Sequence, residues 1–455
     1  MAAAMTVSKE GITTLENREK YTIGIIGCER EALATTCLLA DAGFRIINVS
    51  TDQRLAHLPK RPTTLSHEPK LDKLIKKHLK TNRITVTTNA KEAASASDII
   101  VFNVPTSIDK NEEPNYSYFE KVCREVGMGL RSGCLAIFQS AVGPGTIETV
   151  VKESIENASG LKAGVDFGLA YSPTRAAPGQ VLRDIATNPR IVGAINEESL
   201  NSACLLLSTI TKGEIVKVTN MRTAEAANMF ENAYTNVNAA LANELAQFCE
   251  KTGIDFFEAQ KAANTNYHCH LTIPEISNGH ISKNSILLVE EAEAAKAKPR
   301  MLILAKKAND GMLSHTLRMV KEALRSCGKT VRRAKILILG VSSHPNTKEH
   351  RGSPTKKLVR MLKKRGAFVQ VYDPFFSQKE LEKMRYPAGK TLTKSAEGID
   401  CLLIAVRHTR FKRLSLRRLK FLVRKPAAIV DMGHIVDPQS AEREGFVYRG
   451  IGRGV

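Results

Sequence analysis

The chain has 455 residues, 43% of them hydrophobic, and it contains no Trp. This length predicts two or three domains with aliphatic cores, and no apolar run approaches the ~20 residues of a membrane-spanning helix, which argues against a helical membrane protein. The formal net charge of +21 favours anionic partners such as nucleic acid, anionic lipid or acidic protein, although a general bias in surface charge is the simpler interpretation.

The nine cysteines are scattered along the chain without a CxxC pair. An odd number without paired spacing is typical of reduced thiols in a cytosol rather than of a disulfide framework. The N-terminal stretch MAAAMTVSKEGITTLENREK also lacks the apolar segment of a secretory signal. We therefore expect a cytoplasmic protein.

The first half of the chain alternates apolar, β-branched runs with helix-like stretches. Alternating strands and helices imply a parallel sheet with helices on both faces, as in a Rossmann-like domain, which we place at residues 1–210. Its predicted elements are strands at 21–27, 44–50, 98–105 and 134–142, and helices at 31–43 and 70–80.

Residues 222–252 contain neither Pro nor Gly, and their Ala, Leu, Met, Asn and Glu predict one long helix. Further helices are expected to about residue 327, so that 211–327 forms a central helical domain. Long connecting helices of this kind often carry a dimer interface, and we expect a homodimer.

A second α/β domain is predicted at residues 328–455. The fold class is therefore α/β, with two Rossmann-like doubly wound parallel-sheet domains joined by a central helical domain with one long helix. The predicted elements of the second domain are strands at 335–341, 368–374, 401–406 and 427–432, and a helix at 353–365.

Residues 407–425, the basic segment, read RHTRFKRLSLRRLKFLVRK and carry nine Lys or Arg but no Asp or Glu. The Leu and Val residues between the charges predict an amphipathic helix that rests on the sheet. The default interpretation is that the basic face of this helix is solvated. The alternatives are that it binds nucleic acid or another polyanion through counterion release, or that it lies on an anionic membrane. Phe411 and Phe421 are too few aromatic residues to signal base stacking.

Seven segments occur in an order and at spacings that resemble one family. The chain is similar over nearly its full length to the nucleotide-sugar (UDP-glucose/GDP-mannose) dehydrogenases, and most to those that oxidise UDP-N-acetylhexosamines such as UDP-N-acetylmannosamine. The resemblance implies an NAD-binding N-terminal domain and a UDP-sugar-binding C-terminal domain. The segments are NVPTSIDKNEEPNYSY (103–118), SAVGPGTIETVV (140–151), YSPTRAAPG (171–179), AEAANMFENAYTNVNAALANELAQFCEKTGID (224–255), NGH (278–280), PNTKEHRGSP (345–354) and VYDP (371–374).

The chemistry implied by this resemblance is a double oxidation of a sugar C6 alcohol to a carboxylate by two NAD. A Cys thiolate captures the aldehyde, a base takes up protons, and polar groups stabilise the oxyanion. Most of the corresponding positions are changed in this chain. Asn232 and His280 are retained, whereas Ile281, Ser285, Asn228 and Thr174 stand in place of the nucleophilic Cys, an Asp, a Lys and a Glu. A shift of one residue would put Asn284 rather than Ser285 at the Asp position.

The stretch that matches the dinucleotide fingerprint, GCEREA, keeps only its first glycine, Gly27. Glu29 puts a charged side chain where pyrophosphate would approach the helix N-terminus, so we expect impaired binding of NAD. Ser50 stands at the acidic position for the ribose, and Asp52 could substitute for it. The other cofactor positions implied by the resemblance are Pro105 and Thr106, with Ala141 in place of a Thr beside the nicotinamide.

Arg351 stands where the family has an arginine that binds the UDP part, and Arg175 is a second retained substrate-binding position. The neighbours of Arg351 differ from the family, with His344 in place of a Lys and Lys348-Glu349 in place of an acidic pair. Arg351 is therefore either a diphosphate ligand or a surface arginine in a structural turn.

Cys269 lies in a His-Cys-His run at 268–270, which is suggestive of an activated thiol or a metal site. Alternate residues of an extended segment point to opposite faces, and no second ligand pair is near in sequence. We therefore expect a partly buried loop cysteine and no metal.

Two functions remain. The first is a homologue that is inactive or altered as a UDP-sugar 6-dehydrogenase, a dimeric scaffold for a nucleotide, a nucleotide sugar or a larger polyanion. The alternative is a working NAD-dependent oxidoreductase on a UDP-N-acetylhexosamine in polysaccharide precursor synthesis, which could stop at the aldehyde and has only His280 as a retained base. The replaced positions favour the first.

Overall fold

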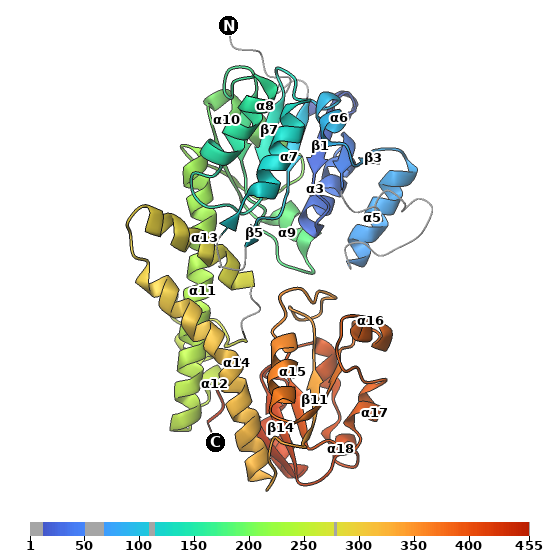
Figure 1. Cartoon of the computed structure of the whole chain (residues 1–455), viewed down its shortest axis with the longest axis vertical. Coiled ribbons are helices and arrows are strands. Elements are labelled where there is room, and N and C mark those ends of the chain that lie inside the picture. The colour runs from blue at the N-terminus through green and yellow to red at the C-terminus, as the bar shows by residue number, and fades with distance from the viewer. Residues whose placement is uncertain (1–11, 51–67, 109–113, 277–279, 455) are drawn as a thin grey trace. The chain divides into compact units, whose positions relative to one another are not determined.

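The chain divides into two compact units, one made of residues up to Glu231 together with 286–297, the other of 232–285 and 298–455. Figure 1 shows the elements of both units in a computed structural model. Among the described residues, no helix has both the length and the apolar character of a membrane span. The structure describes residues 12–50, 68–108, 114–276 and 280–454, with the backbone alone at Pro69, Ile108 and 280–286.

The first unit contains an eight-stranded sheet in the order β10-β9-β8-β7-β4-β1-β2-β3. Neighbouring strands are parallel except β8 and β9. The strand order reverses between β1 and β4, and ligands of such sheets bind outside the carboxyl ends of the strands at this switch point. The strands are β1 (Thr22–Ile26), β2 (Arg45–Val49), β3 (Ile84–Thr87), β4 (Ile99–Phe102), β7 (Leu135–Phe138), β8 (Gly168–Tyr171), β9 (Arg190–Ala194) and β10 (Ile215–Lys217), with a separate hairpin of β5 (Ser107–Ile108) and β6 (Pro114–Asn115).

Helices cover both faces of this sheet because its strands present apolar side chains to both sides. In β4, Ile99 and Val101 join the core under α3, α5, α9 and α10, while Ile100 and Phe102 join the core under α6, α7 and α8. The helices are α2 (Leu15–Arg18), α3 (Arg30–Asp41), α5 (Pro69–Lys80), α6 (Ala90–Ser95), α7 (Ser117–Gly127), the π-helical turn η1 (Ile147–Val151), α8 (Lys152–Ser159), α9 (Val181–Thr187) and α10 (Glu197–Ser208).

The long helix predicted at 222–252 is confirmed as α11 (Met221–Thr252). Its residues up to Glu231 belong to the first unit and those from Asn232 to the second. Helix α13 (His280–Ala294) also contributes to both units. The proposed domain boundaries near residues 210 and 327 stay predictions.

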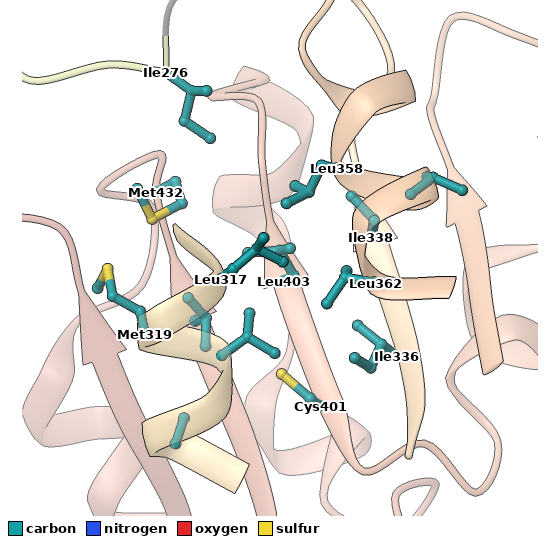
Figure 2. Close-up of a cluster of buried hydrophobic side chains, with 14 of the residues drawn as sticks. Ile276, Leu317, Met319, Ile336, Ile338, Leu358, Leu362, Cys401, Leu403 and Met432 are labelled. Carbon is teal, nitrogen blue, oxygen red and sulfur yellow. The ribbon is translucent and has the colours of Figure 1, made fainter. Parts of the chain in front are cut away.

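The second unit contains a five-stranded, fully parallel sheet in the order β12-β11-β13-β14-β15. Figure 2 shows apolar side chains of β11 and β13 meeting those of α14 and α15 in one core. On the other face the sheet packs against α17, α18 and α19. The elements are α12 (Phe256–Ala263), α14 (Arg300–Ser326), β11 (Lys335–Leu339), α15 (Thr355–Lys364), β12 (Phe368–Tyr372), α16 (Gln378–Lys383), α17 (Leu392–Ala396), β13 (Cys401–Ile404), the 3-10 helix η2 (Thr409–Arg413), α18 (Leu416–Leu419), β14 (Ala427–Asp431), α19 (Pro438–Arg443) and β15 (Phe446–Gly450).

The single amphipathic helix predicted for the basic segment is wrong. The segment forms the short η2 and the one-turn α18, because Leu414 and Ser415 between them have extended backbones and the Ser415 side chain caps the N–H of Arg418. Its predicted contact with the sheet is confirmed, since Phe411 and Leu419 are buried in the core on that face. The other predicted strands and helices are present, with ends displaced by a few residues.

Candidate functional site

Gly27 follows β1 at the switch point, and the surrounding backbone requires a glycine there. Its φ of +138° is one that L side chains rarely adopt, and a Cβ on it would lie 2.1 Å from the Asn103 carbonyl oxygen. The Gly27 carbonyl accepts a hydrogen bond from Asn48 Nδ2 at 3.0 Å. The turn from β1 into α3 thus keeps the close backbone approach that a dinucleotide needs.

Glu29 is the N-cap residue of α3, where the helix presents its positive end. Its backbone is extended and its side chain caps no N–H of the helix. The guanidinium Nη1 of the next residue, Arg30, lies 3.9 Å from Glu68 Oε1. A carboxylate at this helix terminus repels a pyrophosphate. Of the two ribose candidates, Ser50 is buried beyond the end of β2 and Asp52 lies outside the described residues.

Thr174, in the place of the expected glutamate, lies among uncharged groups at the carboxyl edge of the first sheet. Its hydroxyl donates to Gln139 Oε1 at 3.4 Å, and its N–H donates to the Gln139 carbonyl at 3.2 Å. Asn103 Nδ2 lies 3.5 Å from the same hydroxyl, and the Thr35 hydroxyl lies 3.4 Å from Gln139 Oε1. None of these four side chains is a general base at neutral pH.

Asn228, in the place of the expected lysine, is buried on α11 and hydrogen-bonds the Tyr171 hydroxyl. That hydroxyl also donates to the Ser140 carbonyl at 3.1 Å. Burial raises the pKa of Tyr171 beyond its ordinary range, so the pair is neutral. The Asn228 side chain therefore has a hydrogen-bond partner inside the fold. Unlike a lysine, it offers no positively charged donor at this position.

Arg175 is held by an ion pair with Glu231 of α11. Its Nε donates to Glu231 Oε2 at 3.0 Å, its Nη2 donates to Glu231 Oε1, and its Nη1 donates to the Pro189 carbonyl at 3.1 Å. A substrate anion would have to compete with Glu231 for this guanidinium.

The remaining predicted positions are placed in part. Thr106 and Ala141 are together, since the Thr106 hydroxyl donates to the Ala141 carbonyl at 2.7 Å, whereas Pro105 is exposed. Asn232 is half-buried on α11. His280, Ile281 and Ser285 begin α13, and their side chains lie outside the described part of the chain.

Cys269 is half-buried, as expected, and its thiol donates to Asn264 Oδ1 at 3.3 Å. Among the described residues, no three or more His, Cys, Asp or Glu are grouped so that they could hold a metal ion.

Glu225 is a buried acid that the sequence analysis missed. Its Oε2 accepts the N–H of Gly145 at 2.6 Å and its Oε1 accepts the N–H of Ile147 at 2.9 Å. Burial raises its pKa to about 8. Its position on the apolar side of α11, beside Ala224 and Met229, is the signal that could have predicted its burial. Glu225 fixes the turn that carries the SAVGPGT segment.

Asp373 holds the loop after β11 at the carboxyl edge of the second sheet. Its Oδ2 accepts the N–H groups of Val341 and Ser342 at 2.7 and 3.1 Å and lies 3.1 Å from His408 Nε2. His408 Nδ1 accepts the N–H of Asn346 at 2.9 Å, which makes Nε2 the protonated nitrogen of a neutral ring. Burial alone would raise the pKa of Asp373, but these hydrogen bonds hold it below its ordinary value.

Arg351 lies further along the same loop, with its side chain 70% exposed. Its Nε is 3.5 Å from Glu349 Oε1, which also accepts the backbone N–H of Arg351 at 3.0 Å. The loop therefore presents a guanidinium to solvent at the edge where the strands of a parallel sheet end and ligands bind.

Comparisons with known proteins agree with this architecture. Models of the UDP-glucose/GDP-mannose dehydrogenase family match as an NAD binding domain at 21–210, a central domain at 222–311 and a UDP binding domain at 337–438. The UDP-N-acetyl-D-mannosamine dehydrogenase of Pyrococcus horikoshii is 30% identical over 95% of this chain and 99% of its own. That of Methanocaldococcus jannaschii is 28% identical over 96% and 98%.

Two solved structures extend the likeness to the fold. The UDP-D-ManNAc dehydrogenase structure from Pyrococcus horikoshii aligns with a TM-score of 0.85 at 28% identity, over 95% of this chain and 99% of its own. The NDP-N-acetyl-D-galactosaminuronic acid dehydrogenase from Methanosarcina mazei aligns with a TM-score of 0.80 at 26% identity, over 97% and 98%. NAD is thus the cofactor expected at 21–210, where the Gly27 turn fits it and Glu29 opposes it.

Replacing Glu29 by Gly is expected to strengthen NADH binding about fivefold, because it removes from a helix N-terminus a negative charge whose repulsion of the phosphates costs ~1 kcal/mol. Isothermal titration calorimetry of NADH into both proteins measures the change. Glu153→Gly, which removes an exposed charge from the first turn of α8, is the matched control and should leave the affinity unchanged. An unaltered affinity in E29G would show that this carboxylate does not oppose the phosphates.

Replacing Glu225 by Gln is expected to destabilise the first unit by about 1–3 kcal/mol, because an amide NH2 then faces a backbone N–H. Folding raises the pKa of Glu225 from 4.5 to about 8, so its contribution to stability is complete below pH 4.5 and is lost as the pH rises through 8. The difference in free energy of unfolding between wild type and E225Q should therefore shrink from pH 6 to pH 9 in urea titrations. The exposed Glu148→Gln is the control, and a pH-independent difference would contradict the argument.

Proposed function

The chain belongs to the UDP-glucose/GDP-mannose dehydrogenase family, and we propose that it keeps the family's nucleotide-binding fold without the complete oxidation of a sugar alcohol to a carboxylate. The observation that carries the proposal is Ile281, a side chain without a nucleophilic atom, directly after the Gly-His pair where the family has its Cys. Without a thiolate no thiohemiacetal or thioester forms, so the second oxidation has no covalent intermediate.

The surroundings of the reaction centre support the same proposal. NAD, when bound, supplies the hydride acceptor for the alcohol. The chain must then take up the alcohol proton, and Thr174 and Gln139 cannot do so because neither ionises in the relevant pH range. Asn228 supplies no positive charge to a developing oxyanion. His280 is the retained side chain that can accept a proton.

The second unit is the better preserved part of the proposed scaffold. Its loop at 341–354 is fixed by Asp373 and His408, and it presents Arg351 at the carboxyl edge. Because its relatives are named UDP-N-acetyl-D-mannosamine dehydrogenases, we propose a UDP-N-acetylhexosamine or its UDP part as the ligand. Arg351 would pair with the diphosphate.

The proposed assembly is a homodimer through α11. Exposed apolar side chains lie on this helix at Tyr234, Leu241, Leu245 and Phe248, with 37–58% of each accessible. Spacings of seven, four and three residues place them on one face, the pattern of a helix that packs against another helix. A second copy of this chain would cover them.

No turnover is expected when the protein is mixed with NAD and UDP-N-acetylmannosamine or UDP-N-acetylglucosamine, because the nucleophile and the carboxylate base are replaced. Absorbance of NADH at about 340 nm and product analysis measure the result. Formation of an aldehyde would establish the one-step oxidoreductase instead, and formation of the uronate would refute the proposal altogether.

Calorimetric titration with UDP is expected to detect binding that Arg351→Ala weakens by about tenfold or more, since a charge-assisted hydrogen bond contributes ~1.5–3 kcal/mol. The matched control is Arg332→Ala, which removes an exposed arginine just before β11 and should leave UDP affinity unchanged. Equal losses in both variants would exclude a specific role for Arg351.

The double variant Leu241→Asp/Phe248→Asp is expected to be monomeric, because two charges would be buried in the proposed helix–helix contact. Light scattering coupled to size-exclusion chromatography reports the mass. The control Leu15→Asp/Met128→Asp places two charges at exposed apolar positions away from α11 and should leave the dimer intact. A wild-type monomer would end this part of the proposal.

A further inference from the structure

The positive charge of the chain is concentrated in its last part. Residues 328–455 contain 29 Lys and Arg against 10 Asp and Glu, whereas the preceding 327 residues contain 38 against 36. A general bias in surface charge would affect the whole chain alike. The excess therefore belongs to the sheet domain of the second unit and requires an explanation there.

Within this domain, exposed cations gather where the strands of the sheet begin. Lys335 is the first residue of β11, Lys363 and Lys364 end α15 just ahead of β12, and Lys425 precedes β14. In a parallel sheet these positions share one edge, opposite the edge that carries Arg351. We define the amino-edge patch as Arg332, Arg333, Lys335, Lys363, Lys364 and Lys425, all of them exposed.

Contacts within the unit bring these segments together. The N–H of Arg333 donates to the Gly366 carbonyl at 2.8 Å, which joins the turn before β11 to the end of α15. On the other side, Lys335 Nζ lies 3.9 Å from the Cβ position of Gly398, and the Gly398 N–H donates to the Leu422 carbonyl of the basic segment at 2.7 Å. Since β12, β11, β13 and β14 are neighbours ~4.8 Å apart, the patch extends over about 15 Å.

The carboxylates of Asp400 and Glu444 lie near this edge but do not neutralise the patch. Asp400 is fully buried, and its Oδ1 is 2.8 Å from both Lys329 Nζ and Arg424 Nη2. Nearby, Lys420 pairs with Glu444 at 2.5 Å. Both carboxylates form their salt bridges with cations outside the patch. Glu444 also interacts electrostatically with Lys425, and the exposed Glu397 precedes Gly398, but the six cations of the patch outnumber these acids and leave it positively charged.

Two aromatic side chains stand exposed among these cations. Phe421, four residues before Lys425, is 79% exposed, with Lys420 Nζ 5.5 Å from its ring centroid. Phe368, the first residue of β12, is 64% exposed. A single exposed ring is ordinary on a protein surface, but an exposed ring beside a cation is suited to stacking on a base.

We propose that the amino-edge patch binds single-stranded nucleic acid. Its Lys and Arg side chains contact the phosphates, and Phe421 and Phe368 stack on bases. An extended polymer fits a row of cations spread over about 15 Å, whereas a small anion requires donors that converge on one point. Because the patch and the proposed UDP loop lie at opposite edges of the sheet, the proposal goes beyond the proposed function and does not depend on it.

An anionic membrane suits the same surface less well. Membrane-surface binding by a basic segment relies on a helix with a free apolar face. In this segment α18 has four residues, and Leu414, Leu416, Leu422 and Val423 pack against the core of the sheet. Phe421 and Phe368 would then be the apolar side chains left to enter a bilayer. The combination of exposed cations and exposed rings therefore favours nucleic acid over a membrane as the partner.

The test uses the full chain and a fluorescein-labelled RNA of mixed sequence, about 20 nucleotides long, in fluorescence anisotropy from about 50 to 300 mM salt. Wild type should bind with an affinity that falls steeply with salt. The variant K363A/K364A/K425A should bind at least tenfold less tightly at about 100 mM salt, and its log–log salt slope should be smaller by about 2, since each phosphate contact contributes ~0.7. Phe421→Ala should weaken binding about fivefold or more with an unchanged slope.

The control is K70A/K73A/K80A, which removes the same charge from exposed positions on α5 in the first unit. It should alter RNA affinity by less than about threefold. Equal losses in the two triple variants, or absence of RNA binding at low salt, would overturn the proposal, as would binding to phosphatidylserine vesicles but not to RNA. The same variants should bind UDP as tightly as the wild type does. If the wild type does not bind UDP at all, the proposed UDP ligand is refuted, but the proposal of RNA binding is not.

Discussion

The direction of the strands is the constraint on which both units depend. Parallel strands send every loop that follows a strand to one edge and every segment that precedes a strand to the other. In the first unit this brings Gly27, Asn103 and Thr174 to one edge, although they are far apart in sequence. In the second unit the same rule separates Arg351 from Lys335 and Lys425. A single sheet thus offers two surfaces that can differ in ligand without disturbing each other.

Two of the positions that we propose were replaced, Thr174 and Asn228, illustrate how the reaction could be lost without loss of the fold. Thr174 and Asn228 are uncharged, and each has found partners within the first unit, Gln139 and Tyr171. A buried Lys or Glu needs a charged partner or a ligand, whereas an amide or hydroxyl needs one hydrogen bond. Groups that position backbone behave differently: Gly27 allows no side chain, Glu225 accepts two backbone N–H groups, and Asp373 accepts three. The reaction could therefore change while the residues that position the backbone stayed the same.

Periodicity and turn residues predict most of the fold, because apolar β-branched runs such as 335–341 and the Pro- and Gly-free run at 222–252 reflect local physics. The basic segment was mispredicted because the Leu and Val residues between its charges suit a helix, whereas the extended backbones of Leu414 and Ser415 interrupt it. Resemblance to the family led to the positions that we propose were replaced, but not to Gln139, Glu225 or His408, whose roles arise from contacts over 35 residues or more. The concentration of charge was present in the sequence, but its position at the amino edge required the sheet order.

The carboxylate of Asp373 links two stretches of chain that are far apart in sequence. It fixes the start of the loop that leads to Arg351, and through His408 it also fixes the start of the basic segment. Asn346 and Thr409 tie the same two stretches together by two further hydrogen bonds, at 2.8 and 2.9 Å. In evolutionary terms the two stretches cannot drift separately at this point. A substitution in either stretch would be selected by its effect on both the loop that carries Arg351 and the basic segment.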